Sequence, residues 1–201
     1  EEPNGHIFLQ PKIDDTLPIE KPVPVVDQAR CSHCGACNRI CRFGAIACLP
    51  KQTLVYPELC HACGGCELIC PCDAIQEVPR PIGTLRQGTS GHIRFVDGTL
   101  NIGEAMSPPA IRAVKAAAPE TDLVLLDAPP GTSCPAIEAV RDSDFVILVT
   151  EPTPFGLHDL TLAVEMVRAL KLPMGVVVNR AGMGDDSVLR YCSGHRVSVL
   201  A

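Results

Sequence analysis

The chain has 201 residues, of which 46% are apolar, 20% charged and 3% aromatic, and its formal net charge is −6. This apolar content suits one ordinary core plus a small second unit, unlike the composition of a disordered chain. The acidic balance and the few aromatic rings exclude nucleic-acid binding as a primary function, because that needs a basic face and stacking side chains. No apolar run approaches the roughly 18 residues of a membrane span, and residues 1–4 lack the features of a signal peptide. We therefore expect a cytoplasmic protein.

Twelve cysteines are present, and ten of them fall between Cys31 and Cys72. Residues 31–46 and 60–75 form an internal repeat with 8 of 16 positions identical, and each copy reads C-x2-C-x2-C-x3-C. This spacing lets a short loop wrap one face of an iron–sulfur cube, and Gly35 and Gly64 permit its tight turns. A disulfide framework suits short secreted chains, and nothing in this sequence indicates export. Two zinc knuckles would leave half of these repeat cysteines without a role. The spacing therefore predicts two [4Fe–4S] clusters.

This stretch, residues 25–80, resembles a bacterial two-cluster ferredoxin. In that pattern the fourth cysteine of each copy binds the cluster of the other copy. The resemblance implies one cluster on Cys31, Cys34, Cys37 and Cys70, and a second on Cys60, Cys63, Cys66 and Cys41. One departure is Arg42, because the family has a proline at this position. That proline is not a ligand, so the ligand set is unaffected. Cys48 and Cys72 are interpreted as packing residues, with Cys72 as an alternative ligand.

Beyond residue 80 the sequence alternates between strand-like and helix-like segments. We expect a hairpin over residues 92–102 that turns at Asp97-Gly98, helices over 109–118, 135–141, 157–170 and 187–192, and strands over 123–126, 145–150, 175–178 and 197–200. Continuous apolar strands separated by helices predict an α/β fold whose parallel sheet is covered on both faces. Ligands of such folds bind at the carboxyl ends of the strands, and Asp127, Gly131, Asn179 and Arg180 stand at or just after these ends.

These motifs resemble those of the MinD/ParA-like P-loop ATPases, and the whole chain is similar to the group whose ATPase domain carries an inserted ferredoxin module. The resemblance implies a nucleotide-binding domain of residues 1–24 and 81–201 around a ferredoxin domain of residues 25–80. It assigns Asp127 to the water shell of Mg²⁺ as the catalytic residue and Gly131 to the γ-phosphate of ATP. Asn179, with Arg180 beside it, would contact the adenine. It also implies a homodimer formed around the nucleotide.

The phosphate loop of that family, G-x4-G-K-[S/T], is not present in the chain, and none of the five lysines follows a glycine. The chain also opens on Glu1 and stops just after the apolar residues 197–200. We therefore expect a fragment of a longer protein. The loop amides and lysine supply most of the phosphate binding in that family, so residues 1–201 alone are not expected to act as an ATPase. The longer protein is expected to be one.

Three functions follow from the combined motifs. The first is low-potential electron transfer to or from a redox protein, coupled in the intact protein to binding or hydrolysis of ATP with Mg²⁺. The second is an ATPase that assembles or carries iron–sulfur clusters. The third is an electron-transfer module on an inactive ATPase scaffold. Two complete sets of four cysteines argue against labile transfer of these clusters.

Overall fold

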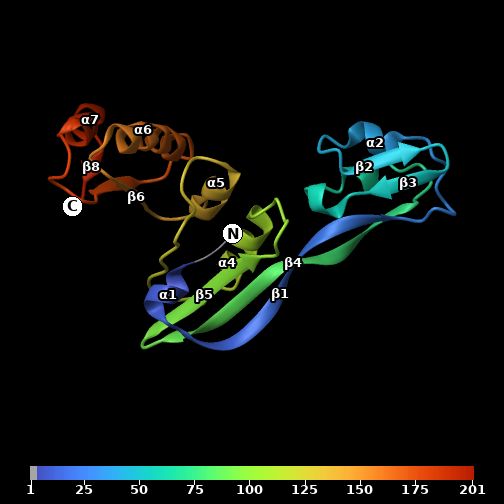
Figure 1. Ribbon diagram of the computed structural model, residues 1–201, viewed down its shortest axis with the longest axis horizontal. Helices are drawn as coiled ribbons and strands as arrows, with labels where there is room; N and C mark the ends of the chain where they lie inside the picture. Colours follow the sequence, from blue (N-terminus) through green and yellow to red (C-terminus); the bar gives the residue numbers. More distant parts are fainter. Residues whose placement is uncertain (1–3) are drawn as a thin grey trace. The chain divides into compact units, whose positions relative to one another are not determined.

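The computed structural model describes residues 4–201, so the chain start at Glu1 lies outside the described part. The chain divides into two compact units, residues 1–122 and 123–201 (Figure 1). The first unit contains α1 Gly5–Leu9, β1 Lys12–Val26, α2 Ala36–Ile40, β2 Ile46–Leu49, β3 Gln52–Val55, a 3-10 helix Pro57–Leu59, α3 Gly65–Leu68, β4 Ile75–Ser90, β5 Ile93–Leu100 and α4 Pro108–Ala116. The second contains α5 Cys134–Val140, β6 Val146–Thr150, α6 Pro154–Ala169, β7 Met174–Val178, α7 Ser187–His195 and β8 Ser198–Val199. No described helix is both long and apolar enough to cross a bilayer.

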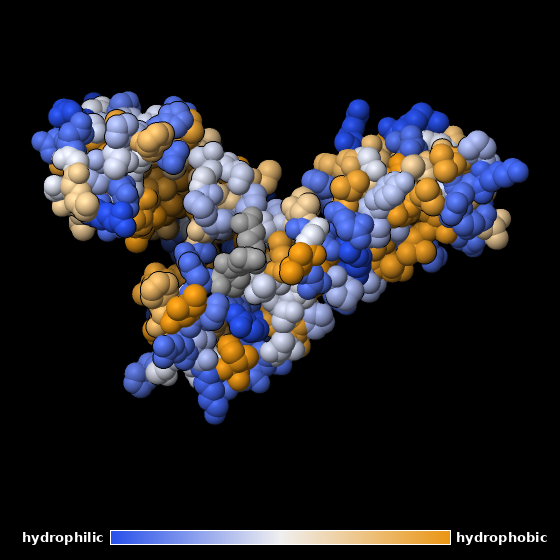
Figure 2. Space-filling model, in the orientation of Figure 1, coloured by the Kyte–Doolittle hydropathy of each residue, from blue (hydrophilic) through white to orange (hydrophobic). Residues whose placement is uncertain are grey.

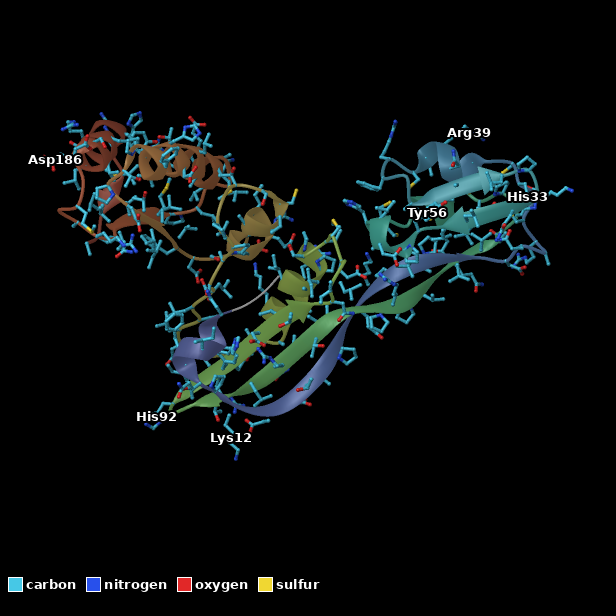
Figure 3. The ribbon with its side chains drawn as sticks, viewed as in Figure 1. Lys12, His33, Arg39, Tyr56, His92 and Asp186 are labelled. Atoms are coloured by element: carbon cyan, nitrogen blue, oxygen red, sulfur yellow. The ribbon has the colours of Figure 1, made fainter. Side chains whose placement is uncertain are left out.

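A long antiparallel ribbon of β1 and β4 organises the first unit, and β5 adds to its far half in the order β1-β4-β5. The prolines of β1 fit this arrangement, because β1 is an edge strand and proline cannot donate to a sheet ladder. The cysteine repeat lies at the other end of the ribbon, where β2 and β3 form a separate hairpin. Lys12 and His92 mark one end of this unit, and His33 and Tyr56 mark the other (Figure 3). Both β1 and β4 run unbroken through residues 24 and 80, and the domain boundaries predicted there stay a prediction.

The expected hairpin at Asp97-Gly98 is wrong. β5 runs unbroken through both residues, and the chain instead turns at Gly91, which has a φ of 58°. Asp97 is only 5% exposed, and its buried charge is compensated by Arg86 across the ladder, whose Nε and Nη2 donate to the Asp97 carboxylate at 2.9 Å and 2.5 Å. A Cβ atom on Gly98 would lie 2.8 Å from Val114 Cγ2, so this glycine allows α4 to pack closely on the sheet. The Asp-Gly pair therefore serves packing rather than a turn.

The second unit holds a parallel sheet in the order β6-β7-β8, as the apolar runs predict. The helices expected in this half are confirmed as α5, α6 and α7, with ends shifted by a few residues. Its core contains Leu160 and Val164 of α6, Val176 of β7 and Cys192 of α7. The predicted covering of both faces of this sheet is not observed. Side chains of β6 alternate between more buried and more exposed positions, and Ile147 and Val149 are 53% and 66% exposed. Figure 2 shows apolar surface on this unit.

The strand expected over residues 123–126 is also wrong. Residues 123–129 form no strand, and Leu123 and Leu125 are 74% and 81% exposed. The sheet has no ladder to this segment, because β6 pairs with β7 alone. An apolar run acquires strand structure only when a neighbouring strand takes up its backbone hydrogen bonds.

Candidate metal centre

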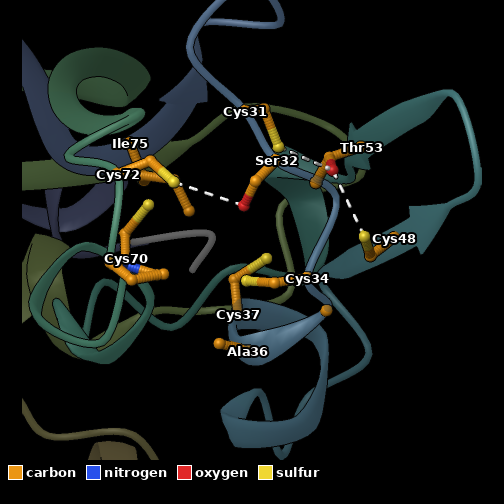
Figure 4. A pocket seen from close by; sticks show the side chains of 12 residues that line it. Cys31, Ser32, Cys34, Ala36, Cys37, Cys48, Thr53, Cys70, Cys72 and Ile75 are labelled. Carbon is orange, nitrogen blue, oxygen red and sulfur yellow. Dashed lines mark hydrogen bonds between the residues drawn. The ribbon is translucent and has the colours of Figure 1, made fainter.

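Four cysteines from the two sequence copies meet at one cavity beside α2 (Figure 4). Cys31, Cys34 and Cys37 come from the first copy, whereas Cys70 follows α3 in the second. Their sulfur atoms face a common space in Figure 4. The structure thus brings together the four residues that the ferredoxin pattern assigns to one cluster. Thiolates are soft ligands suited to iron–sulfur clusters, so this donor set fits such a cluster.

Each cysteine loop reverses direction at a glycine. Gly35 and Gly64 have φ angles of 74° and 69°, a left-handed conformation that glycine adopts without steric cost. Each glycine is the N-cap of the short helix that follows, α2 or α3. The helical turn then carries the third cysteine of the copy inward, so that Cys37 and Cys66 are only 8% and 9% exposed.

The second predicted set contains two buried cysteines, Cys60 and Cys66, and two more accessible ones, Cys41 and Cys63. Cys41 belongs to the first copy, yet it packs against a core cluster that contains Cys60. The backbone N–H of Ala62 donates a hydrogen bond to Cys60 Sγ at 3.4 Å. Cys41 thus lies by a cysteine of the second copy, as Cys70 lies by those of the first.

Burial and backbone polarity act on these thiols in opposite directions. Burial raises the pKa of the Cys37 thiol, and it raises the pKa of Cys66 to about 11. The backbone N–H of Ala36, by contrast, lowers the pKa of the exposed Cys34. A thiol loses its proton when it ligates a metal. Cluster binding at the two buried positions therefore needs iron to compensate a thiolate that burial alone disfavours.

Hydroxyl and thiol groups line the first cavity beside the four cysteines. Thr53 is 3% exposed, and its Oγ1 lies 3.4 Å from Cys31 Sγ and 3.5 Å from Cys48 Sγ. The thiol of Cys72 donates to Ser32 Oγ at 3.2 Å (Figure 4). Hydrogen bonds to the sulfurs of a cluster tune its potential. No sequence motif marks Thr53, because only the pairing of β2 with β3 brings it beside Cys48.

A buried ion-pair network supports the second cysteine set. Lys21 of β1 is 1% exposed, and its Nζ donates to the carbonyl oxygen of Cys60 at 3.1 Å and to Glu104 Oε2 at 3.3 Å. Glu104 also pairs with Arg80 at 2.5 Å, and Arg80 pairs with Glu58 at 3.1 Å. A buried charge needs such partners. Lys21 therefore ties the backbone of a predicted ligand to residues well outside the repeat.

The residues predicted to bind nucleotide lie in the second unit and are only partly brought together. Asn179 and Arg180 follow β7, where Asn179 N–H donates to the carbonyl of Thr150 at 2.8 Å and Arg180 pairs with Glu151 at 3.3 Å. The carboxyl ends of β6 and β7 are therefore adjacent. Asp127 and Gly131 lie in the irregular segment before α5, and in the described chain neither forms a hydrogen bond or ion pair with Asn179 or Arg180.

Comparison with known proteins identifies two 4Fe-4S binding domain motifs, at residues 24–47 and 53–76. The chain is 35% identical over 157 residues to the uncharacterized protein MJ0578 of Methanocaldococcus jannaschii, which covers 77% of this chain and 55% of that protein. It is 29% identical over 108 residues to the uncharacterized protein MJ0579 of the same organism, covering 53% of this chain and 40% of that one. The chain thus spans about half the length of these relatives.

These matches show that the chain binds 4Fe–4S clusters through its two cysteine motifs. Within residues 4–201, no three His, Cys, Asp or Glu side chains are gathered as ligands of a single metal ion. In a 4Fe–4S cluster each of the four irons would take one thiolate, so the four cysteines of one set need not meet at a single metal ion.

Proposed function

We propose that this chain is a ferredoxin-type electron-transfer protein with two [4Fe–4S] clusters. One cluster is held by Cys31, Cys34, Cys37 and Cys70, and the other by Cys60, Cys63, Cys66 and Cys41. The observation that supports this most directly is the cavity at which Cys70 joins the three cysteines of the first copy. A cluster of this type supplies one-electron transfer at low potential.

The cysteines of each set differ in how far they are buried. Cys37 and Cys66 are buried and would hold each cluster from inside the fold, whereas Cys34 and Cys63 are exposed and would bring each set to the surface. An exposed ligand suits electron exchange with another protein. Two complete sets of four thiols favour resident clusters over the alternative of a cluster carrier, whose cargo must leave.

Anaerobic reconstitution of residues 1–201 with iron and sulfide tests this function. We expect about eight irons per chain and a thiolate-to-iron absorbance that bleaches with dithionite and returns on oxidation. A chain that takes up about two zinc ions in preference, or whose absorbance does not recover after one redox cycle, would contradict it.

We further propose that, in a longer protein that contains this chain, electron transfer is coupled to ATP and Mg²⁺ by a MinD-like domain that dimerises around the nucleotide. The adjacent carboxyl ends of β6 and β7 support this, because ligands of parallel sheets bind there. Asp127 would serve the metal, Gly131 the γ-phosphate, and Asn179 with Arg180 the base. The phosphate loop would come from outside residues 1–201.

Nucleotide titration separates the two proposals. Residues 1–201 should neither bind ATP tightly nor hydrolyse it, because they contain no G-K-[S/T] loop. A longer natural form with such a loop should hydrolyse ATP, and Asp127→Asn should abolish this while leaving the cluster absorbance unchanged. Appreciable ATP turnover by residues 1–201 would overturn this assignment of the phosphate site.

A further inference from the structure

The two copies of the repeat carry opposite charges. Residues 31–46 contain Arg39 and Arg42 and no acidic residue, whereas residues 60–75 contain Glu67 and Asp73 and no lysine or arginine. Cluster ligation needs none of these four side chains, and all four are exposed. The charge difference therefore concerns the surface around each cluster.

A shallow groove opens on the surface where the first cysteine set is most accessible. It is lined by Cys34, Ala36, Arg39, Ile40, Arg42, Ile69 and Pro71. Cys34 is exposed, and Ile40 and Ile69, from different copies, are 43% and 46% exposed. The groove thus combines a predicted ligand, an apolar floor and two guanidinium groups. Arg39 is labelled in Figure 3 at the end of the unit opposite Lys12.

Neither arginine is used to neutralise a carboxylate of the chain. Arg39 Nη1 donates to the carbonyl oxygen of Cys34 at 3.0 Å, which holds its charge beside the ligand. Within residues 4–201, the ion pairs involve neither Arg39 nor Arg42. Arg39 and Arg42 therefore add two unpaired positive charges to this groove, in a chain of net charge −6.

We propose that this groove docks an acidic redox protein that exchanges electrons with the first cluster. The inference rests on the proposed electron-transfer function. Arg39 and Arg42 would bind carboxylates of the partner, for which guanidinium geometry is well suited, and Ile40 and Ile69 would exclude water from the contact. The first cluster, when bound, would supply one electron to a one-electron acceptor on the partner, and no proton or other group would be transferred. A small, polar, steered interface is typical of such encounters.

The test uses reconstituted holoprotein and two acceptors that share one cofactor but differ in charge: basic cytochrome c and the same protein made acidic by succinylation of its lysines. The holoprotein is reduced with dithionite, and electron transfer is followed by stopped flow at about 10 mM and about 0.5 M salt. Arg39→Glu/Arg42→Glu is compared with Lys12→Glu/Arg94→Glu, which makes the same charge change at the other end of the unit. Arg42→Glu alone leaves the Arg39 hydrogen bond to the Cys34 loop intact.

At low salt, wild type and the Lys12/Arg94 variant should reduce the acidic acceptor at similar rates. The Arg39/Arg42 variant should be about tenfold slower or more, and Arg42→Glu should be slowed in the same direction; high salt should remove the difference. The proposal would be overturned if both double variants were slowed equally or if neither was slowed. It would also be overturned if wild type formed a dimer that the Arg39/Arg42 variant did not form, because the groove would then join two copies of this chain. Bleaching of the absorbance by dithionite and its return on oxidation must be unchanged in every variant. Failure of this cycle in wild type would instead overturn the electron-transfer function.

Discussion

Cys70→Ala is expected to remove the cluster held by Cys31, Cys34 and Cys37, although in sequence Cys70 follows the cysteines of the other set. The reason is spatial: Cys70 lines the same cavity as Cys31, Cys34 and Cys37 of the first copy. Iron content should fall from about eight to about four per chain, measured after anaerobic reconstitution. Because Cys72 lies on the same cavity, Cys70→Ala/Cys72→Ala is the stricter form of this variant.

Pairs of substitutions identify which cluster is lost. If Cys70 and Cys31 hold the same cluster, Cys31→Ala/Cys70→Ala still retains about four irons, whereas Cys60→Ala/Cys70→Ala retains almost none. Cys134→Ala, an exposed cysteine outside the repeat, should keep all of them. The opposite ranking of the two double variants would show that Cys70 belongs with Cys60.

Lys21→Met is expected to lower the free energy of unfolding by about 3 kcal/mol, because it breaks a buried ion pair and leaves the Cys60 carbonyl without its donor. With a urea dependence of about 2 kcal/mol per M, the unfolding midpoint should fall by about 1.5 M. Far-ultraviolet circular dichroism of the holoprotein measures this. The cluster held by Cys60 should also bleach at lower urea than the other.

Lys12→Met is the matched control, since Lys12 is an exposed lysine on the same strand and should change stability by no more than about 0.5 kcal/mol. Equal effects of the two substitutions would mean that the Lys21–Glu104 pair contributes nothing. Bleaching of both clusters together in Lys21→Met would show that the pair supports the unit as a whole rather than the second site.

Several elements were readable from the sequence because their signals are local. The parallel strands β6 and β7 are short apolar runs, each followed directly by a polar residue, Glu151 or Asn179. The helix expected over 157–170 exists, but α6 begins earlier, at Pro154, because the side chain of its N-cap Thr153 accepts a hydrogen bond from Gly156 N–H. The turn predicted at Asp97-Gly98 was wrong because contacts with distant residues decide the structure there. The pair has turn propensity, but a cross-strand ion pair and the close approach of Val114 decide its conformation. The strand expected at residues 123–126 likewise depends on a partner strand that its own residues do not encode.

The sequence by itself determined that this chain binds 4Fe–4S clusters, because three of the cysteines of each motif lie within seven residues and their spacing can be read directly from the sequence. The tertiary structure alone decided what surrounds them. It brings Thr53 to Cys31, Lys21 to the carbonyl of Cys60, and Ile69 to the arginines of the other copy. Each of these contacts joins residues that are distant in sequence. The physical reason is that burial, potential and docking depend on chain pairing across the fold, which no local pattern records.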